Sequence, residues 1–471
     1  MTDLLVGADV GTSNLKVGVF DTAGNLSALS QRDCPPTYGP DGRVELDCES
    51  WWRAFEGAYR DCLHEVNAEA IKAIGVSSQA QSYVLLDAHD LPLGPVVSWL
   101  DTRGDAEGTA RCLEGHDYYA HTGWATPNPM LAACKLRQHS HSADAWAGAE
   151  RLLFADSYLI FRLTGAAATS RNLAAMSGLY SMQTNGWWPA AVECARLPLA
   201  LLPELRNVAE TVGTLRPELA RSWKMNAVPV VAGVNDQTAA ALGAGLCTQG
   251  EVTLGLGTAL VAYQVIGPAA PPHPARLLRG PYVGGLAYQL ALSSTAGAAV
   301  SWVREVLAPG VEADRLYAEA LTVAPGCDGL RARPDFGDAP GSSGGFFGLT
   351  LAHTRAHIFR AVLEGVACVA REKLDLLSAR EPVRVTGGGS ANDGWMQVLA
   401  DVTGRTLERA EQPHAGLWGT ALLAGHGAGL FGDVLHAVQS TRRAGRRFTP
   451  CRAHASIYAR VFDDYVRLKG V

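Results

Sequence analysis

The sequence has no run of apolar residues long enough to cross a membrane, and its formal net charge is −6. It has one arginine-rich cluster, between residues 442 and 447, which is interpreted as solvated surface. Nucleic acids and anionic membranes are bound mainly by concentrated positive charge. Neither is therefore expected as a partner, and a content of 48% hydrophobic and 18% charged residues is typical of a soluble globular protein.

The ten cysteines are scattered, and none belongs to a Cys-x-x-Cys pair. The usual ligand spacing of a zinc knuckle and the dithiol of a redox motif are therefore both missing. Cys62 and Cys368 fall within apolar helical patterns and are expected to be core thiols. The first residues, LLVGADV, are strand-like and show no basic-then-apolar signal segment. A reducing cytoplasm is the expected location.

Three familiar nucleotide motifs are also missing. The sequence has no GxxxxGK[ST] phosphate loop and neither the HRD nor the DFG motif of protein kinases. What it does have is a set of four glycine- or acid-bearing turns, each of which follows a segment with strand character.

Length predicts two domains, because 471 residues exceed one ordinary hydrophobic core. Segment 8–19 reads ADVGTSNLKVGV and segment 254–265 reads LGLGTALVAYQV, and each predicts a strand, a Gly-Thr turn and a second strand. One such hairpin opens each half of the chain. We therefore expect α/β domains over residues 1–245 and 246–471.

The first turn, Asp9-Val-Gly-Thr-Ser, has the residues that a phosphate site needs. Gly11 lets the backbone approach a phosphate, and the hydroxyls of Thr12 and Ser13, with consecutive N–H groups, donate to its oxygens. Asp9 stands at the strand end, where it can hold Mg²⁺ through water, and Lys16 just past the turn can face phosphate. For this turn alone, a plain hairpin with a capping aspartate is the alternative.

Two further turns are rich in glycine. Gly255-Leu-Gly-Thr258 has the same Gly-Thr turn as the first hairpin but has no aspartate corresponding to Asp9. Two such hairpins indicate that the protein holds one polyphosphate from two sides. Gly387-Gly-Gly-Ser-Ala-Asn392 lies between a strand-like and a helical segment, so its backbone can accept a base, a ribose or an anion. A tight strand-to-helix turn is the alternative.

The fourth turn, Asn235-Asp236-Gln237, precedes a helix of small residues predicted over 238–245. Taken alone, Asp236 is interpreted as a helix N-cap. Phosphoryl transfer needs in-line positioning, charge neutralisation and commonly a carboxylate that accepts the hydroxyl proton. In combination with the three glycine turns, Asp236 is the candidate base.

The ordered set of motifs resembles the FGGY carbohydrate kinases, relatives of the actin, hexokinase and Hsp70 ATPases. Among members of the family the sequence is most similar to the xylulokinases, and the similarity spans essentially the whole chain. The segments that carry it are DVGTSNLKVGVFD (9–21), RVELDCESWW (43–52), SWLDTRGD (98–105), DSYLIFRLTG (156–165), VPVVAGVNDQTAAALGAG (228–245), LGLGTA (254–259), GGFFGLT (344–350), RAVLEGVA (360–367) and VTGGGSANDGWMQVLADVTG (385–404).

The resemblance implies a fold of two ribonuclease-H-like domains with an interdomain cleft. Sugar would bind mostly to the first domain and ATP-Mg²⁺ mostly to the second. The implied activity is the ATP-dependent transfer of a phosphoryl group to a small sugar or polyol in carbohydrate metabolism, with D-xylulose as the first candidate substrate and xylulose 5-phosphate as its product. Oligomeric state stays open, with a homodimer as one form.

The resemblance also implies residue roles. Asp236 falls on the catalytic base and Asp9 on the metal-side acid, with Asp236 also facing the metal. The residues implied in nucleotide binding are Gly11, Thr12, Ser13, Lys16, Gly257, Thr258, Gly388, Gly389 and Asn392. Those implied in substrate binding are Gln79, Gln81, Asp101, Arg103, Asn235 and Asp236.

Three departures from the family pattern all lie in the sugar-binding half. Ala80-Gln81 replaces the Met-His of xylulokinases, Thr169-Ser170 replaces Thr-Asp, and Lys135-Leu-Arg-Gln138 lacks the usual tryptophan. The alternative substrates are therefore ribulose, gluconate, glycerol, erythritol and a quorum-sensing polyol. An actin- or Hsp70-like ATPase, and a kinase-like protein that binds sugar without phosphoryl transfer, are the alternatives outside that class.

Overall fold

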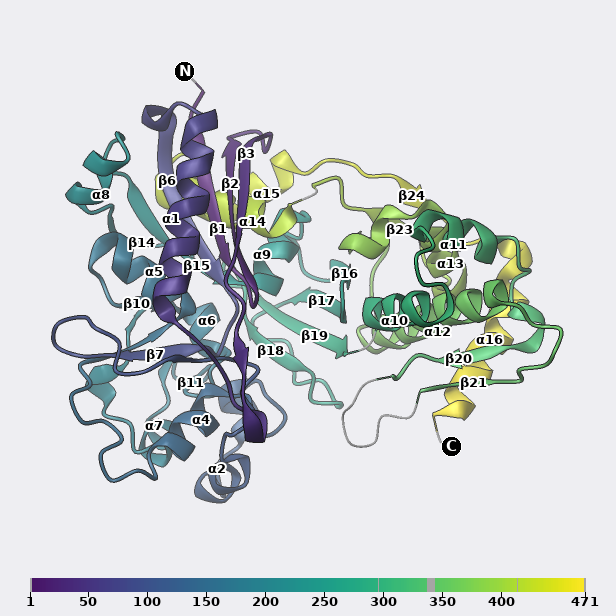
Figure 1. Cartoon of the computed structure of the whole chain (residues 1–471), viewed down its shortest axis with the longest axis horizontal. Helices are drawn as coiled ribbons and strands as arrows, with labels where there is room; N and C mark the ends of the chain where they lie inside the picture. The colour runs from purple at the N-terminus through teal and green to yellow at the C-terminus, as the bar shows by residue number, and fades with distance from the viewer. Residues whose placement is uncertain (1, 295, 337–343, 413, 470–471) are drawn as a thin grey trace. The chain divides into compact units, whose positions relative to one another are not determined.

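The computed structural model describes residues 2–294, 296–336, 344–412 and 414–469, and Figure 1 shows its elements. The chain forms two compact units, each made of three segments. Unit 1 comprises Met1–Cys247, Ile266–Tyr288 and His414–Arg442, and unit 2 comprises Thr248–Val265, Gln289–Pro413 and Arg443–Val471. The first change of unit falls between Cys247 and Thr248. The structure adds two later segments to unit 1, because both pack with its elements.

The main sheet of unit 1 has six strands in the order β14-β15-β6-β1-β2-β3. β1 and β2 form the first predicted hairpin, while β1, β6 and β15 run parallel to one another. The strand bounds are β1 (Leu4–Val10), β2 (Asn14–Asp21), β3 (Leu26–Asp33), β6 (Ile71–Ser78), β14 (Thr211–Thr214) and β15 (Pro229–Asn235).

The two faces of this sheet are covered by different helices because side chains alternate along each strand. Val6, Ala8 and Val10 of β1 share one apolar core with residues of α1 (Cys48–Glu65) and α5 (Ala155–Thr164). The opposite face carries α14 (Ala415–Gly427), which also packs on α9 (Asp236–Gly243).

A glycine on β1 explains how α14 approaches so closely. A Cβ atom on Gly7 would lie 2.1 Å from the carbonyl oxygen of Leu417, and one on Gly75 would lie 2.6 Å from that of Thr420. Gly7 and Gly75 are register partners on adjacent strands. The helix therefore rests against backbone rather than side chains.

A second sheet of unit 1 has five strands in the order β4-β5-β8-β7-β9. The remaining elements of the unit are β4 (Thr37–Tyr38), β5 (Val44–Leu46), β7 (Tyr83–Leu86), β8 (Val96–Val97), α2 (Ala106–Cys112), α3 (Tyr118–Thr122), α4 (Ala132–His139), β9 (Arg151–Phe154), β10 (Ala168–Ser170), α6 (Arg171–Ala175), β11 (Tyr180–Ser181), β12 (Gly186–Trp187), α7 (Pro189–Cys194), β13 (Glu204–Arg206), α8 (Pro217–Ser222), β18 (Leu278–Pro281) and α15 (Val434–Thr441).

Unit 2 repeats the hairpin-led arrangement. Its strands follow the order β19-β17-β16-β22-β23-β24, in which β16 and β17 form the second predicted hairpin and β16 runs parallel to β22. Its elements are β16 (Val252–Leu256), β17 (Leu260–Ile266), β19 (Ala287–Ser293), α10 (Gly297–Leu307), α11 (Ala313–Leu321), β20 (Arg331–Arg333), β21 (Gly345–Phe347), α12 (Arg355–Leu376), β22 (Val383–Thr386), α13 (Asp393–Thr403), β23 (Leu407–Arg409), β24 (Arg447–Phe448) and α16 (Ala455–Leu468).

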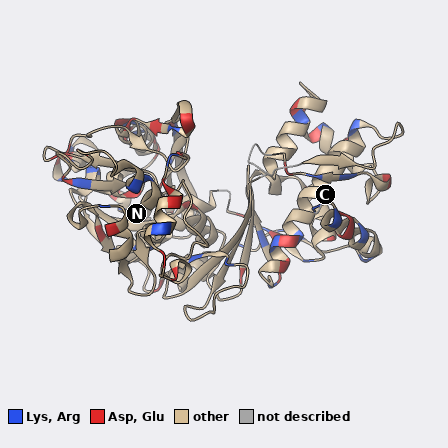
Figure 2. Ribbon diagram, turned by 90° about the horizontal axis from the view of Figure 1, so that it is seen from below, with Lys and Arg blue, Asp and Glu red and all other residues tan. Residues whose placement is uncertain are grey.

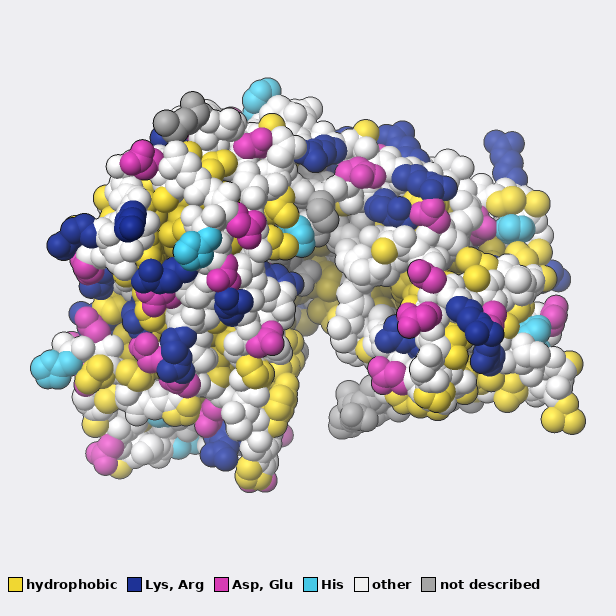
Figure 3. All heavy atoms as spheres, turned by 45° about the horizontal axis from the view of Figure 1, so that its top comes forward, with side chains coloured by type: hydrophobic (Ala, Val, Ile, Leu, Met, Phe, Trp, Pro, Cys, Tyr) yellow, Lys and Arg dark blue, Asp and Glu magenta, His cyan; other side chains and the backbone are white. Residues whose placement is uncertain are grey.

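The surface carries charges of both signs. Lysine and arginine alternate with aspartate and glutamate over the ribbon in Figure 2, and the face shown in Figure 3 mixes the two signs without a continuous basic area. None of the helices in the described ranges is long and apolar enough to span a membrane.

Candidate active site

Three parallel strands of unit 1 end at one edge of its main sheet. β1 pairs with β6, and β6 pairs with β15. Just past β6, the backbone N–H of Gln79 donates to the carbonyl of Val10 at 2.8 Å. The predicted residues Asp9, Gln79 and Asp236 therefore lie at the carboxyl edge of one sheet, where open α/β sheets bind ligands.

Asp9 and Asp236 form a pair of interacting carboxylates. The pKa of Asp9 is raised to about 7, first by burial and then by the charge of Asp236, although Lys16 and a hydrogen bond from Ser77 act in the opposite direction. Lys16 is the cross-strand partner of Asp9 in the hairpin. Two carboxylates that repel one another make a site that favours a divalent cation.

The described part of the chain contains no group of three or more His, Cys, Asp or Glu side chains placed to hold a metal ion. The described residues therefore do not form a metal site in which protein side chains supply all the ligands. Mg²⁺ is commonly held by one or two carboxylates while water and substrate phosphates supply the remaining ligands. The pair Asp9 and Asp236 fits that chemistry.

Asp236 is the first residue of α9, but it is not the residue that caps the helix. The side chain of Asn235 caps it by accepting a hydrogen bond from the N–H of Thr238 at 2.9 Å. The carboxylate of Asp236 accepts from the adjacent N–H of Gln237 at 2.8 Å and is solvent-exposed. Desolvation of this carboxylate raises its pKa, although its hydrogen bonds with Gln237 act in the opposite direction. Asp236 is thus free of the capping role that the sequence alone favoured.

Asn235 is held from its other side by Asn172, which the sequence did not single out. The side-chain oxygen of Asn172 accepts from both the backbone N–H and the side-chain amide of Asn235, each at 2.8 Å. The amide of Asn172 donates to the carbonyl of Pro281 at 2.7 Å. Asn235 is buried and its polar atoms are used inside the protein, so it positions Asp236.

The first phosphate turn is closed by a hydrogen bond from the N–H of Gly11 to the carbonyl of Asn14 at 3.0 Å. Thr12 and Ser13 follow at the surface of the turn. The indole N–H of Trp99 donates to the Thr12 hydroxyl at 2.9 Å. Trp99 stands within the segment SWLDTRGD, and only the fold brings it to the turn, because 87 positions separate the two residues.

The second turn, in unit 2, is fixed by the start of α10. The N–H of Gly297 donates to the carbonyl of Gly257 at 3.1 Å, and that of Ala298 to the carbonyl of Thr258 at 3.1 Å. A Cβ atom on Gly297 would lie 2.3 Å from the Gly257 oxygen. Gly257 and Thr258 are exposed. A glycine at 297 is therefore required for α10 to support this turn.

The third turn lies beside the second, because β16 and β22 are neighbours. Gly387 has a φ of 89°, and a Cβ atom on it would lie 2.6 Å from the carbonyl oxygen of Leu256. Nothing lies within 4 Å of a Cβ atom on Gly388, so its backbone is open to a ligand. Asn392 caps α13 by accepting from the N–H of Trp395 at 2.9 Å.

Gln79 and Gln81 lie at the end of β6. Gln79 is 5% exposed, yet neither its side-chain oxygen nor its nitrogen has a partner among the described residues. Gln81 has a φ of 71° and is 8% exposed. A buried amide without partners costs stability, so Gln79 is suited to bind hydroxyl groups of a ligand.

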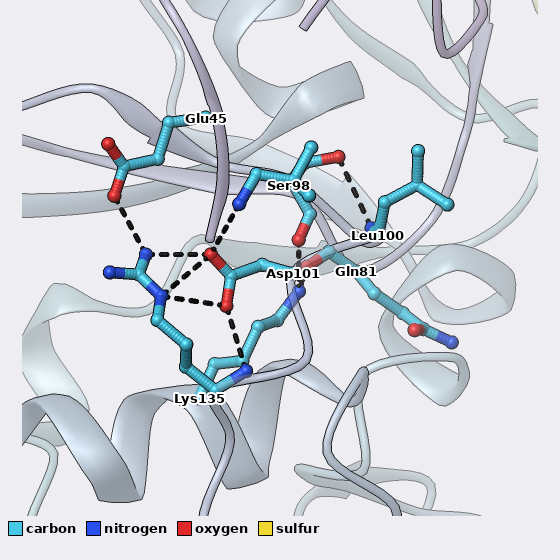
Figure 4. A network of polar contacts seen from close by, with 8 residues as sticks. Glu45, Gln81, Ser98, Leu100, Asp101 and Lys135 are labelled. Atoms are coloured by element: carbon cyan, nitrogen blue, oxygen red, sulfur yellow. Dashed lines mark hydrogen bonds and ion pairs between the residues drawn. The ribbon is translucent and has the colours of Figure 1, made fainter. Parts of the chain in front are cut away.

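Asp101 belongs to a closed polar network, shown in Figure 4. Its carboxylate accepts from the N–H of Val44 at 3.0 Å and from the backbone and guanidinium of Arg103. Burial alone would raise the pKa of Asp101, but these hydrogen bonds outweigh it and the pKa lies below its ordinary value. Arg103 also donates to Glu45 at 2.7 Å. Asp101 therefore holds Arg103, whose side chain is partly exposed.

Lys135 is the buried cation of this network. Its ammonium donates to the backbone carbonyls of Ser98 at 2.7 Å and Gln81 at 3.1 Å (Figure 4). Burial lowers its pKa to about 7, against the opposing charge of Asp101. Lys135 thus joins the two predicted substrate segments, and no spacing within the sequence indicates this contact.

The family is shown by direct comparison. The model of the N-terminal domain of the FGGY family of carbohydrate kinases matches residues 4–243, and the model of its C-terminal domain matches residues 272–428. The chain belongs to the FGGY family of carbohydrate kinases. Members of the family use ATP, and the predicted family, fold class and kinase class are confirmed.

Individual relatives differ in substrate. A glycerol kinase from Rhodospirillum centenum is 33% identical, covering 95% of this chain and 93% of that protein. A xylulose kinase from Lactococcus lactis is 28% identical, covering 92% and 89%. The solved structure of a xylulose kinase from Rhodospirillum rubrum aligns with a TM-score of 0.87 at 26% identity, over 99% of this chain and 98% of that one.

Proposed function

We propose that the protein transfers the γ-phosphoryl group of ATP to a hydroxyl group of a small sugar or polyol, with Asp236 as the base. The observation that supports this most is the position of Asp236 at the sheet edge, exposed and relieved of helix capping by Asn235. A raised pKa makes this carboxylate a better proton acceptor than an ordinary aspartate.

In the proposed step the substrate hydroxyl oxygen forms a bond to the γ-phosphorus while the bond to the β-γ bridging oxygen breaks. The hydroxyl proton passes to the carboxylate of Asp236, and ADP leaves with the bridging oxygen. Phosphoryl transfer of this kind depends on positioning and on neutralising charge. Asn235 and Asn172 supply the positioning of the base.

Asp9 and Asp236 are the residues that would hold Mg²⁺, which neutralises charge on the transferring phosphoryl group when bound. Lys16 adds a fixed positive charge opposite Asp9. The backbone and hydroxyls of Thr12 and Ser13 on unit 1, and of Gly257 and Thr258 on unit 2, are proposed as phosphate donors. Gly388, Gly389 and Asn392 are proposed to contact adenosine.

Gln79 and Gln81 are proposed to face the substrate, with Arg103 held by Asp101 beside them. An amide that both donates and accepts suits the hydroxyls of a sugar or polyol. D-Xylulose is the first candidate, supported by xylulose kinases among the relatives. Glycerol is the second, because a glycerol kinase is the relative with 33% identity.

The test is ADP release by the purified protein with Mg²⁺-ATP and, separately, xylulose, ribulose, gluconate, glycerol and erythritol. We expect one of these to raise kcat/KM well above the rest and above the rate without sugar. Xylulose as the best substrate supports the first candidate, and glycerol the second. ATP turnover that no sugar or polyol stimulates would contradict the proposed transfer and favour an ATPase.

A further inference from the structure

Unit 1 contains a cavity of about 830 Å³ that none of the proposed catalytic or binding residues lines. Its wall is formed by α3, the start of α6, the β11–β12 hairpin, the turn between β18 and β19, and the junction of α14 with α15. We infer that this cavity is a second binding site, for a small organic anion with an apolar part. The inference does not depend on which sugar the enzyme phosphorylates.

Two arginines give the cavity its charge. Arg171 and Arg279 both line it, and the hydrogen bonds that they donate within the described residues go to oxygens of uncharged groups. Arg171 donates to the side-chain oxygen of Asn207 at 3.0 Å, and Arg279 to the carbonyl of Ala270 at 3.0 Å. These neutral partners do not offset the two guanidinium charges, and two positive groups at a concave surface favour an anion.

Arg279 also has one hydrogen-bond donor without an acceptor among the described residues. Its Nε–H is buried and finds no acceptor within the described ranges of the chain. A buried donor without a partner costs free energy, which an incoming acceptor removes. Among the described residues of the wall Asp433 is the only carboxylate, and it caps α15 by accepting from the N–H of His436 at 2.7 Å.

The turn between β18 and β19 adds backbone donors. Gly284 and Gly285 are exposed and adopt φ values of 64° and 75°. The turn is closed by the bonds Tyr282 N–H to Leu286 O (2.9 Å) and Leu286 N–H to Val283 O (3.2 Å), which leave the two glycine N–H groups outside it. Consecutive N–H groups of this kind form an anion-binding concavity.

The rest of the wall is largely apolar. Met182, Val208, Pro272 and Val434 line the cavity together with the ring of Tyr180. A mostly apolar pocket with a few convergent polar groups is the usual form of a small-molecule site. Inorganic phosphate would use the arginines and leave this apolar wall uncovered, so the expected occupant carries a ring or hydrocarbon portion beside its anionic group.

Hydrogen bonds of Asn172 connect the cavity wall to the active site. Pro281 lines the cavity and its carbonyl accepts from Asn172, while Asn172 also holds Asn235, the cap of α9. Arg171, the neighbour of Asn172 in the sequence, lines the same cavity. We therefore expect an occupant to change the kcat of sugar phosphorylation.

The probe is phenyl phosphate, which combines a ring with an anion, titrated calorimetrically into the full-length protein saturated with a non-hydrolysable ATP analogue. The analogue blocks the nucleotide site. We expect binding, and weaker binding of inorganic phosphate and of benzyl alcohol, which each lack one half of the probe. No heat of binding at millimolar phenyl phosphate would overturn the inference.

The site is located by variants. Arg279→Gln and Arg171→Gln should each weaken phenyl phosphate binding by about tenfold or more, because each removes one charge-assisted contact. Arg221→Gln, on α8 and outside the cavity, should leave binding unchanged. Unchanged affinity in both cavity variants would place the probe elsewhere and overturn the inference.

A crystal structure of the native protein with phenyl phosphate tests the location of the site even if an arginine variant fails to fold. We expect the ring of the bound probe to lie beside Val208 and its phosphate beside Arg279. A probe bound only elsewhere overturns the proposed site. Coupling is tested separately, by sugar phosphorylation at saturating probe. A changed kcat supports the path through Asn172, and an unchanged kcat overturns that path.

Discussion

At Gln79 the protein buries a side-chain amide that has no hydrogen-bond partner within the described part of the chain. Leaving such a group unpaired costs about 1–3 kcal/mol, a cost that a bound hydroxyl group would remove. The same side chain therefore works against stability in the free protein and for affinity in the complex.

Gln79→Met separates these two effects. We expect the melting temperature to stay the same or rise, since the unpaired amide is removed, while KM for the accepted substrate rises about fivefold to tenfold. Thermal unfolding and steady-state kinetics measure the pair of effects. Gln31→Met, on the exposed side of β3, is the control and should change neither. A lower melting temperature with an unchanged KM would make Gln79 a structural residue.

Lys135 predicts a pH dependence of stability. Its pKa is about 7 in the folded protein against an ordinary value of 10.5, so between these values the unfolded chain binds a proton that the folded chain does not. Stability of the native protein relative to Lys135→Met should therefore rise with pH from about 7 towards 10.5, by up to about 1.4 kcal/mol per pH unit, and stay flat below pH 7.

Urea unfolding of both proteins at pH 6, 7, 8 and 9 measures this difference. The comparison with Lys135→Met cancels the titration of the other groups. A stability difference that is the same at all four pH values would show that the Lys135 ammonium keeps its ordinary pKa despite its burial.

The sequence predicts the roles of Asp9 and Asp236 because each stands at a turn with a recognisable local pattern. It does not predict the contacts made by Trp99, Asn172 and Lys135. These join positions 37 to 109 residues apart, and no spacing within one segment encodes them. The sequence likewise does not predict the burial of Asp101, since its partners Val44 and Lys135 come from other elements.

Among the elements, α14 is the one whose place depends most on glycine. It crosses α9 so closely that a Cβ atom on Gly419 would lie 2.0 Å from the carbonyl oxygen of Ala239, and one on Gly243 would lie 1.8 Å from that of Ala415. The sequence predicted a small-residue helix over residues 238–245, and α9 begins and ends two residues earlier. Local composition could not predict which helix would pack against it.

Gly419→Ala should destabilise the protein by about 1–3 kcal/mol, because the added methyl group overpacks a backbone contact. Gly416→Ala on the same helix is the matched control, since nothing lies within 4 Å of its Cβ position. There the loss of a helical glycine should be neutral or stabilise by up to about 1 kcal/mol. Equal effects in denaturant unfolding would contradict the close crossing of α9 and α14.

Across the whole molecule, the length and the two hairpins predicted two domains, and the structure has two compact units. The sequence did not predict that His414–Arg442 belongs to unit 1, because that segment follows most of unit 2 in the chain. Packing decides its place: Trp418 contacts the ring of Phe20, and the Thr420 hydroxyl donates to Ser77 at 2.8 Å.

A fragment of residues 1–247 should therefore fail to unfold cooperatively, because removing α14 uncovers one face of the main sheet. Joining residues 414–442 to the fragment through a flexible linker should restore a cooperative transition in circular dichroism. A sharp transition in the shorter fragment would show that α14 is dispensable for the core of unit 1.

The Asp236→Asn variant tests whether Asp236 is the base that accepts the hydroxyl proton. ADP release is assayed on the best substrate of the panel, and ATP and sugar binding are measured by calorimetry. A general base contributes about 10²- to 10⁴-fold to rate, so we predict a fall in kcat of at least that order while both ligands still bind. Asp314→Asn, an exposed aspartate on α11, should keep native turnover. Near-native turnover by the Asp236→Asn protein would show that Asp236 is not the base.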